Sequence, residues 1–100
     1  MIRGTTPTHT ITLSVPLDDL KDFVVTYAQN KKVVLEKTKA DYTVEEDKLV
    51  ITLTQEETLK FNHDDLVEVQ AKVLTMSGAV FASQIESVFV GRILNEGVLV

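Results

Sequence analysis

Apolar and polar residues alternate along most of this chain with a period of two, and this rhythm restricts its fold more than any other feature. In residues 10–15 the odd-numbered positions are aliphatic and the even-numbered positions are Thr or Ser. In residues 65–76 every odd-numbered position from 67 to 73 is Val or Ala. A β-strand with one buried face has a period of two, whereas an amphipathic helix repeats every 3.6 residues. The sequence therefore predicts a chain built from strands.

Seven strands are predicted, each ended by a turn or a charged connection. They are Thr10–Val15, Phe23–Gln29, Lys32–Lys37, Asp41–Glu45, Lys48–Thr54, Asp65–Met76 and Val80–Ile93. Short strands at close spacing with little helix are typical of two packed antiparallel sheets. A chain of 100 residues that is 44% hydrophobic has enough apolar surface for one core. We therefore expect residues 1–100 to form a single all-β domain, an antiparallel two-sheet β-sandwich of immunoglobulin-like type.

The middle of the chain supplies a hairpin and one helical turn. The strands on either side of Glu46–Asp47 form the hairpin, and its inward set is Tyr42, Val44, Leu49, Ile51 and Leu53. Residues 54–57, Thr-Gln-Glu-Glu, match a capping box, in which the Thr and Glu side chains satisfy each other's backbone amides. A short helical turn is predicted near Gln55–Lys60, and it brings Leu59 and Phe61 over an open end of the core.

The turn between the last two predicted strands determines which residues face each other. A two-residue loop at Ser77–Gly78 mixes apolar with polar partners, whereas a three-residue loop keeps the two faces consistent. The longer loop pairs Val69 with Ile85 and Val73 with Phe81. A β-bulge near Ser87 then turns Val88 and Val90 inward.

The charge and cysteine content exclude several kinds of partner and chemistry. Fifteen acidic against ten basic residues give a formal net charge of -5. This argues against nucleic acid and anionic membranes as partners, because both require a concentrated positive field. The absence of cysteine excludes disulfides, thiolate metal sites and thiol nucleophiles. We expect no secretion signal and no membrane anchor, since no apolar stretch approaches the ~20 residues of a membrane span.

Residues that carry catalysis or bind metals are few and scattered. His9 lies among threonines, and His63 precedes Asp64 and Asp65 in what is predicted to be a solvated connection. Three acidic clusters offer oxygens to calcium without EF-hand spacing: Asp18/Asp19/Asp22, Glu45/Glu46/Asp47 and Asp64/Asp65. The favoured interpretation is charge that keeps turns and sheet edges from associating, and a weak calcium site is the alternative. No catalytic, cofactor-binding or metal-binding residue is assigned, and neither a cofactor nor an enzymatic activity is expected.

Five aliphatic residues fall in the last eight positions, where chain ends are normally polar. They are Ile93, Leu94, Val98, Leu99 and Val100. Either they close the core of their own domain, as the ends of short domains do, or they contact another protein chain. These five are the candidate partner-contact residues.

Four segments spread over the chain form a recognisable set: Met1–Thr10, Thr26–Asn30, Leu53–Phe61 and Val90–Leu94. Together they resemble a family of small proteins of about this length encoded in phages and prophages of clostridia and related gut Firmicutes. The alternation is also similar to that of the N-terminal β-sandwich domain of phage baseplate upper proteins. The resemblance implies a virion or assembly context and supplies no catalytic residue. The family favours Asn-Gly where this chain has Asn30-Lys31, so a longer turn is expected here than a type I′ turn with its two positive φ angles.

The leading expectation is a non-enzymatic structural or accessory protein of a phage or prophage, virion or baseplate-like, that docks through an edge strand or its last eight residues. Its expected partners are copies of itself or a larger phage structural protein. The resemblance implies the bacterial cytoplasm during assembly and then the virion. The alternative is an immunoglobulin-like binding module that recognises a carbohydrate or host-surface ligand through loops at one end of the sandwich.

Overall fold

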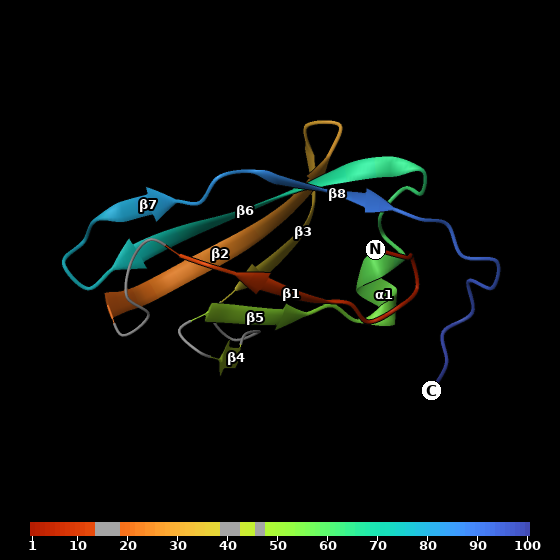
Figure 1. The fold of residues 1–100 in the computed structure, drawn as a ribbon, viewed down its shortest axis with the longest axis horizontal. Helices are drawn as coiled ribbons and strands as arrows, with labels where there is room; N and C mark the ends of the chain where they lie inside the picture. The colour runs from red at the N-terminus through yellow and green to blue at the C-terminus, as the bar shows by residue number, and fades with distance from the viewer. Residues whose placement is uncertain (14–18, 39–42, 46–47) are drawn as a thin grey trace.

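The computed structural model describes residues 1–13, 19–38, 43–45 and 48–100. Within these ranges the chain consists mainly of strands (Figure 1). The strands are β1 (Thr8–Ile11), β2 (Leu20–Gln29), β3 (Lys32–Thr38), β4 (Thr43–Glu45), β5 (Lys48–Thr52), β6 (Asp65–Thr75), β7 (Val80–Ala82) and β8 (Glu86–Val90). The described residues contain one helical turn, α1 (Gln55–Thr58), and no helix long and apolar enough to cross a membrane.

The strands form two antiparallel sheets. In the smaller sheet β5 lies between β1 and β4, and in the larger sheet β2 lies between β3 and β6. The other side of β6 pairs with β8 over its first half and with β7 over its second half. Ahead of β1, Ile2 forms a parallel bridge to Gly91, directly after β8.

This strand order is that of an immunoglobulin sandwich. In that fold strands B, E and D share one sheet, and strands C′, C, F and G share the other. Assigning β1 to β6 as B, C, C′, D, E and F, and β7 with β8 as G, reproduces both sheets. The predicted antiparallel two-sheet β-sandwich of immunoglobulin-like type is confirmed.

The core lies between the sheets, on the faces that the alternation predicted. The larger sheet contributes the odd-numbered residues from 23 to 27 of β2 and from 67 to 73 of β6. The smaller sheet contributes Leu49 and Ile51, and Leu53 follows directly after β5. Of the predicted inward set for this hairpin, Tyr42 and the side chain of Val44 lie outside the described residues.

The first strand keeps its predicted faces but not its predicted bounds. Ile11 and Leu13 are partly buried against the core, while Thr10 and Thr12 are exposed. β1 begins two residues before the predicted start, and β2 begins at Leu20, three residues before its own. The predicted end of the first strand, residues 14 and 15, lies outside the described ranges.

α1 begins at the predicted capping box. The hydroxyl of Thr54 accepts a hydrogen bond from the amide of Glu57 at 3.2 Å, and the carboxylate of Glu57 accepts one from the amide of Thr54 at 2.8 Å. The helix ends at Thr58, two residues before the predicted end. Phe61 follows and is only 1% exposed, so it closes the end of the core as expected.

The predicted strand Val80–Ile93 is two strands, because the chain leaves the β6 ladder at Ser83. The amide of Ser83 donates to the carbonyl of Ala71 at 2.8 Å, and the amide of Ala71 donates to the Ser83 hydroxyl at 2.9 Å. A side-chain oxygen thus replaces the carbonyl that a regular strand presents at this position. The break raises the number of described strands to eight, where seven were expected.

The register around this break is partly as predicted. The amide of Thr75 donates to the carbonyl of Ala79, which leaves a three-residue loop, and Val73 lies opposite Phe81 as expected. Val69 lies opposite Glu86, so its predicted pairing with Ile85 and the predicted bulge near Ser87 are wrong. The irregularity comes earlier, at residues 83–85, and it already turns Val88 and Val90 toward the core.

A two-residue turn joins β2 and β3, so the longer turn expected there is wrong. Asn30 and Lys31 have φ angles of 51° and 64°, the pair of positive values that a type I′ turn requires. Asn tolerates this region better than most residues, and the Asn30 amide group donates to the carboxylate of Asp65 at 3.1 Å. A β-bulge beside Tyr27 then shifts the register of β3, which leaves Leu35 facing the core.

Candidate functional site

The last eight residues, Ile93–Val100, form an arm without regular secondary structure after β8 (Figure 1). Only Ile93 is half-buried, with its side chain beside Gly4. Leu94 is 92% exposed and Leu99 is 80% exposed. Val98 and Val100 are exposed as well. Of the five aliphatic residues, Ile93 alone therefore fits the alternative in which they close the core of their own domain.

The side chain of Gln55, the first residue of α1, holds the far end of the arm. Its amide nitrogen donates to the carbonyl of Leu99 at 2.8 Å, and its oxygen accepts from the amide of Leu99 at 2.9 Å. This pair of bonds is the one that a neighbouring strand makes to a residue opposite it. The backbone of Leu99 is thus held without any burial of its side chain.

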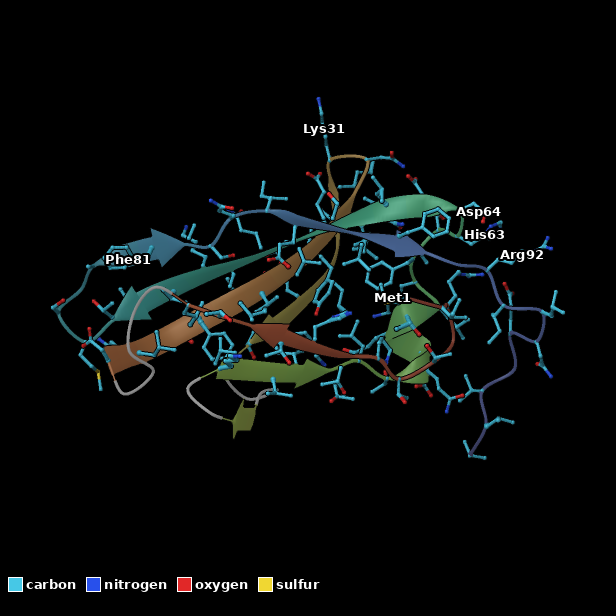
Figure 2. All side chains as sticks on the ribbon, viewed as in Figure 1. Met1, Lys31, His63, Asp64, Phe81 and Arg92 are labelled. Carbon is cyan, nitrogen blue, oxygen red and sulfur yellow. The ribbon has the colours of Figure 1, made fainter. Side chains whose placement is uncertain are left out.

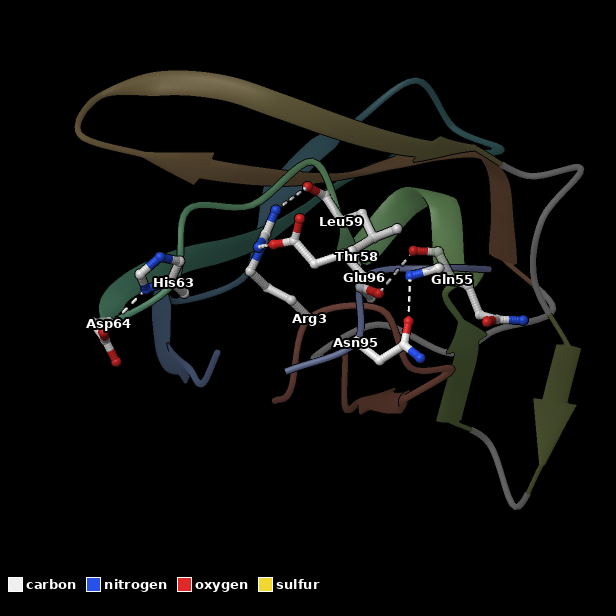
Figure 3. Close-up of polar contacts among 9 residues, drawn as sticks. Arg3, Gln55, Thr58, Leu59, His63, Asp64, Asn95 and Glu96 are labelled. Atoms are coloured by element: carbon white, nitrogen blue, oxygen red, sulfur yellow. Dashed lines mark hydrogen bonds and ion pairs between the residues drawn. The ribbon is translucent and has the colours of Figure 1, made fainter. Parts of the chain in front are cut away.

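A second polar contact holds the middle of the arm (Figure 3). The guanidinium of Arg3 forms an ion pair with Glu96 through one nitrogen and donates to the carbonyl of Leu59 at 2.9 Å through another. The side chain of Asn95 accepts from the amide of Gly97 at 2.8 Å and so forms a tight turn within the arm. The arm is positioned by polar groups, while the side chains of Leu94, Val98, Leu99 and Val100 are exposed.

α1 itself is anchored by an ion pair beneath it. The ammonium of Lys37, on β3, donates to both carboxylate oxygens of Glu57 at 3.0 and 2.8 Å. Burial alone raises the pKa of Glu57, but the hydrogen bonds from Lys37 and Thr54 outweigh it and hold that pKa below its usual value. The helical turn that carries Gln55 is therefore tied to the larger sheet.

The predicted cluster after α1 is exposed. The Nδ1 atom of His63 lies 3.0 Å from the carboxylate of Asp64, and both side chains face solvent (Figures 2 and 3). Asp65 begins β6, and its carboxylate accepts from the amide of Leu66 and from Asn30. The structure therefore does not bring the two aspartates together around one point.

The other acidic clusters lie largely outside what the structure describes. Asp18, Glu46, Asp47 and the side chain of Glu45 are not among the described residues. Asp22 lies on β2, where its carboxylate accepts from the amide of Phe23. In the parts of the chain that the structure describes, no three His, Asp or Glu side chains converge on a common point.

His9 lies in a place that its sequence context did not suggest. Its Nδ1 atom lies 2.8 Å from the hydroxyl of Tyr27, and the two rings are 5.5 Å apart. Burial, and to a lesser extent the α-amino group of Met1, lowers the pKa of His9. Burial raises the pKa of Tyr27, and the charge of Glu57 adds to this. The pair joins β1 of the smaller sheet to β2 of the larger sheet.

Two contributors to the site are not apparent from the sequence. The sequence predicts Gln55 only as a helix residue, and no pattern marks it as the partner of the Leu99 backbone. Arg3 is the other, since its partner Glu96 is 93 positions away along the chain. The Ile2–Gly91 bridge places Arg3 beside the residues that lead into the arm.

Comparisons with known proteins add one structural likeness. No family model matches the chain, and no curated protein matches it. A solved structure that does match is the V domain of amphioxus IgVJ-C2, with 8% sequence identity and a TM-score of 0.38. The match covers 90% of this chain and 96% of that domain. The assignment of the sandwich fold rests on the strand order described above.

Proposed function

We propose that this chain is a non-enzymatic structural or accessory protein of a phage or prophage particle, and that it assembles by docking the arm Ile93–Val100 onto other copies of itself. The observation that carries the proposal is an arm whose backbone is held in place while Leu94 and Leu99 are almost fully exposed. The phage context comes from the resemblance of four segments of the sequence to phage and prophage proteins.

An arm of this kind is suited to docking for two reasons. Its exposed aliphatic side chains gain about 1.5–3 kcal/mol each when they are fully buried against a partner. Because Gln55 and Arg3 already hold the arm, less conformational entropy is lost on binding than for a free tail. The exposed aliphatic side chains of the arm support a contact surface for another chain rather than a cap on its own core.

Light scattering after size-exclusion chromatography tests the proposal on the full-length chain. We expect the wild type to form oligomers that increase with concentration, and the double variant Leu94→Ser/Leu99→Ser to elute as a monomer with unchanged Tm. The matched control is Leu66→Ser/Phe89→Ser, which replaces a cross-strand pair about half exposed on the outer face of the larger sheet. A wild type that is monomeric at every concentration contradicts the proposal. So does association that the control variant abolishes and the arm variant leaves intact.

A further inference from the structure

The two sheets leave a cleft of about 400 Å³ along the edge where β1 faces β7. We call it the β1–β7 cleft; its lining includes Thr10, Ile11 and Leu13 on one side and Ala71, Val73 and Phe81 on the other. Phe81 lies opposite buried Val73 and shares its inward face, yet 45% of Phe81 is exposed. An aromatic side chain that points between the sheets is therefore uncovered at this edge.

A free strand edge borders the cleft. The carbonyl of Pro7 accepts from the amide of Leu53 at 3.0 Å, and hydrogen-bonded pairs alternate along an antiparallel ladder. The odd-numbered residues of β1 therefore bond to β5, while Thr8 and Thr10 direct their N–H and C=O groups away from it. Within the described ranges no strand pairs with that side of β1. An edge of this kind is a template for another strand.

We propose that the arm of a second copy of this chain adds as a strand to the free edge of β1 and covers the β1–β7 cleft with its aliphatic side chains. The inference rests on the proposed function and identifies the surface that receives the arm. Strand addition obtains its affinity from main-chain hydrogen bonds and its specificity from pockets that take alternate side chains. The edge of β1 supplies the first requirement and the cleft supplies the second.

The composition of the arm matches the cleft. Residues 97–100 carry no charged side chain, and Glu86 is the one charged residue in the described lining of the cleft. In a strand, Val98 and Val100 share one face and Leu99 takes the other. Four residues of strand span about 13 Å, and β1 is itself four residues long. The arm therefore offers an apolar face of the length that the edge exposes.

The arm of the same chain is directed elsewhere. Phe81 at the cleft and Arg92 just before the arm lie at opposite ends of the molecule, which is 47 Å long (Figure 2). Gln55 holds Leu99 at the end far from the cleft. The arm of one copy and the cleft of the next are different surfaces, so the contact is head-to-tail and repeats from copy to copy.

Disulfide trapping in the full-length chain tests the inference, since the natural sequence contains no cysteine. Thr10→Cys, exposed on β1, is combined with either Val98→Cys or Leu99→Cys. Neighbouring strands place paired Cα atoms about 4.5–5.5 Å apart, within the reach of a disulfide. Because side chains alternate, only one of the two arm positions shares the face of Thr10. We expect linked dimers and larger multimers from one pair and roughly tenfold less from the other.

The matched control replaces Thr10→Cys by Lys31→Cys, at the exposed turn between β2 and β3 (Figure 2). Equal linkage from Thr10 and Lys31, or equal linkage from both arm positions, overturns the inference. A disulfide that closes within a single chain also overturns it, because the arm then occupies its own cleft. Oligomers that form through the arm without any linkage at Thr10 contradict this inference alone, whereas a wild type that stays monomeric contradicts the proposed function.

Discussion

Lys37 is a buried cation beneath α1, and the carboxylate of Glu57 neutralises it. Removing one member of a buried ion pair lowers the free energy of unfolding by more than the intact pair contributes to it, because the other charge stays buried without a partner. We expect Lys37→Ala to lower the free energy of unfolding in urea by about 3 kcal/mol. Lys60→Ala, at an exposed position, is the control and is expected to change it by less than about 0.5 kcal/mol. If both variants lowered the free energy of unfolding equally, the ion pair would make no specific contribution to stability.

His9 makes the stability of the fold depend on pH. Burial lowers its folded pKa below 6.5, so the unfolded chain takes up a proton first as the pH falls. The stability that neutral His9 contributes is present above pH 6.5 and is lost as the pH falls through the lower folded pKa. We expect the free energy of unfolding to fall less between pH 7 and pH 5 in His9→Gln than in the wild type, as measured by denaturation at each pH. His63→Gln, at an exposed residue, is the control. If it changed the pH dependence of stability as much as His9→Gln does, the pH dependence could not be assigned to His9.

At the scale of elements, the turn between β2 and β3 carries a backbone strain that the fold tolerates. Lys31 has a φ of 64°, a region that costs a residue with a side chain roughly 1 kcal/mol. We expect Lys31→Gly to raise the free energy of unfolding by about 1 kcal/mol, because it restores the Asn-Gly pair preferred in type I′ turns. Lys32→Gly, at the first residue of β3, is expected to lower the free energy of unfolding. Thermal unfolding of both variants measures the difference, and destabilisation by Lys31→Gly is the contrary result.

The arm depends on one side chain of α1 for the position of its far end. We expect Gln55→Ala to speed hydrogen exchange at the amide of Leu99 about tenfold, because that amide loses its hydrogen bond to Gln55. Exchange in the core of β6 is expected to stay unchanged. Gln84→Ala, at an exposed position between β7 and β8, serves as the comparison. Equal protection of Leu99 in wild type and Gln55→Ala would mean that the arm is held in another way.

The elements differ in how well the sequence predicts them, and the reason is where their determinants lie. The capping box at Thr54 and Glu57 is local, so four consecutive residues suffice to predict it. The break between β7 and β8 depends on the Ser83 hydroxyl meeting the amide of Ala71, twelve positions away. The type I′ turn was also missed, because the pairing of β2 with β3 imposes a conformation that Lys31 disfavours by itself.

At the scale of the whole molecule, head-to-tail docking predicts that two defective chains complement each other. Leu99→Asp places a charge on the arm, while Thr10→Pro removes an outward amide from β1 without touching the β5 ladder. We expect each variant alone to be monomeric, with a Tm close to that of the wild type. Mixing them leaves one intact arm and one intact cleft, so a one-to-one heterodimer is expected by light scattering. Monomers in the mixture would show that the arm and the cleft do not meet.

The sequence by itself determined the class of the fold and the faces of its strands, because a period of two requires only that alternate side chains share an environment. It also identified the five aliphatic residues of the arm as candidate partner-contact residues. Only the tertiary structure decided that Leu94 and Leu99 stay exposed, that Gln55 holds the arm, and that β1 borders an open cleft. Each of these features depends on segments that are far apart in the sequence. Their relative positions are fixed only when the two sheets pack, so a local sequence pattern cannot predict them.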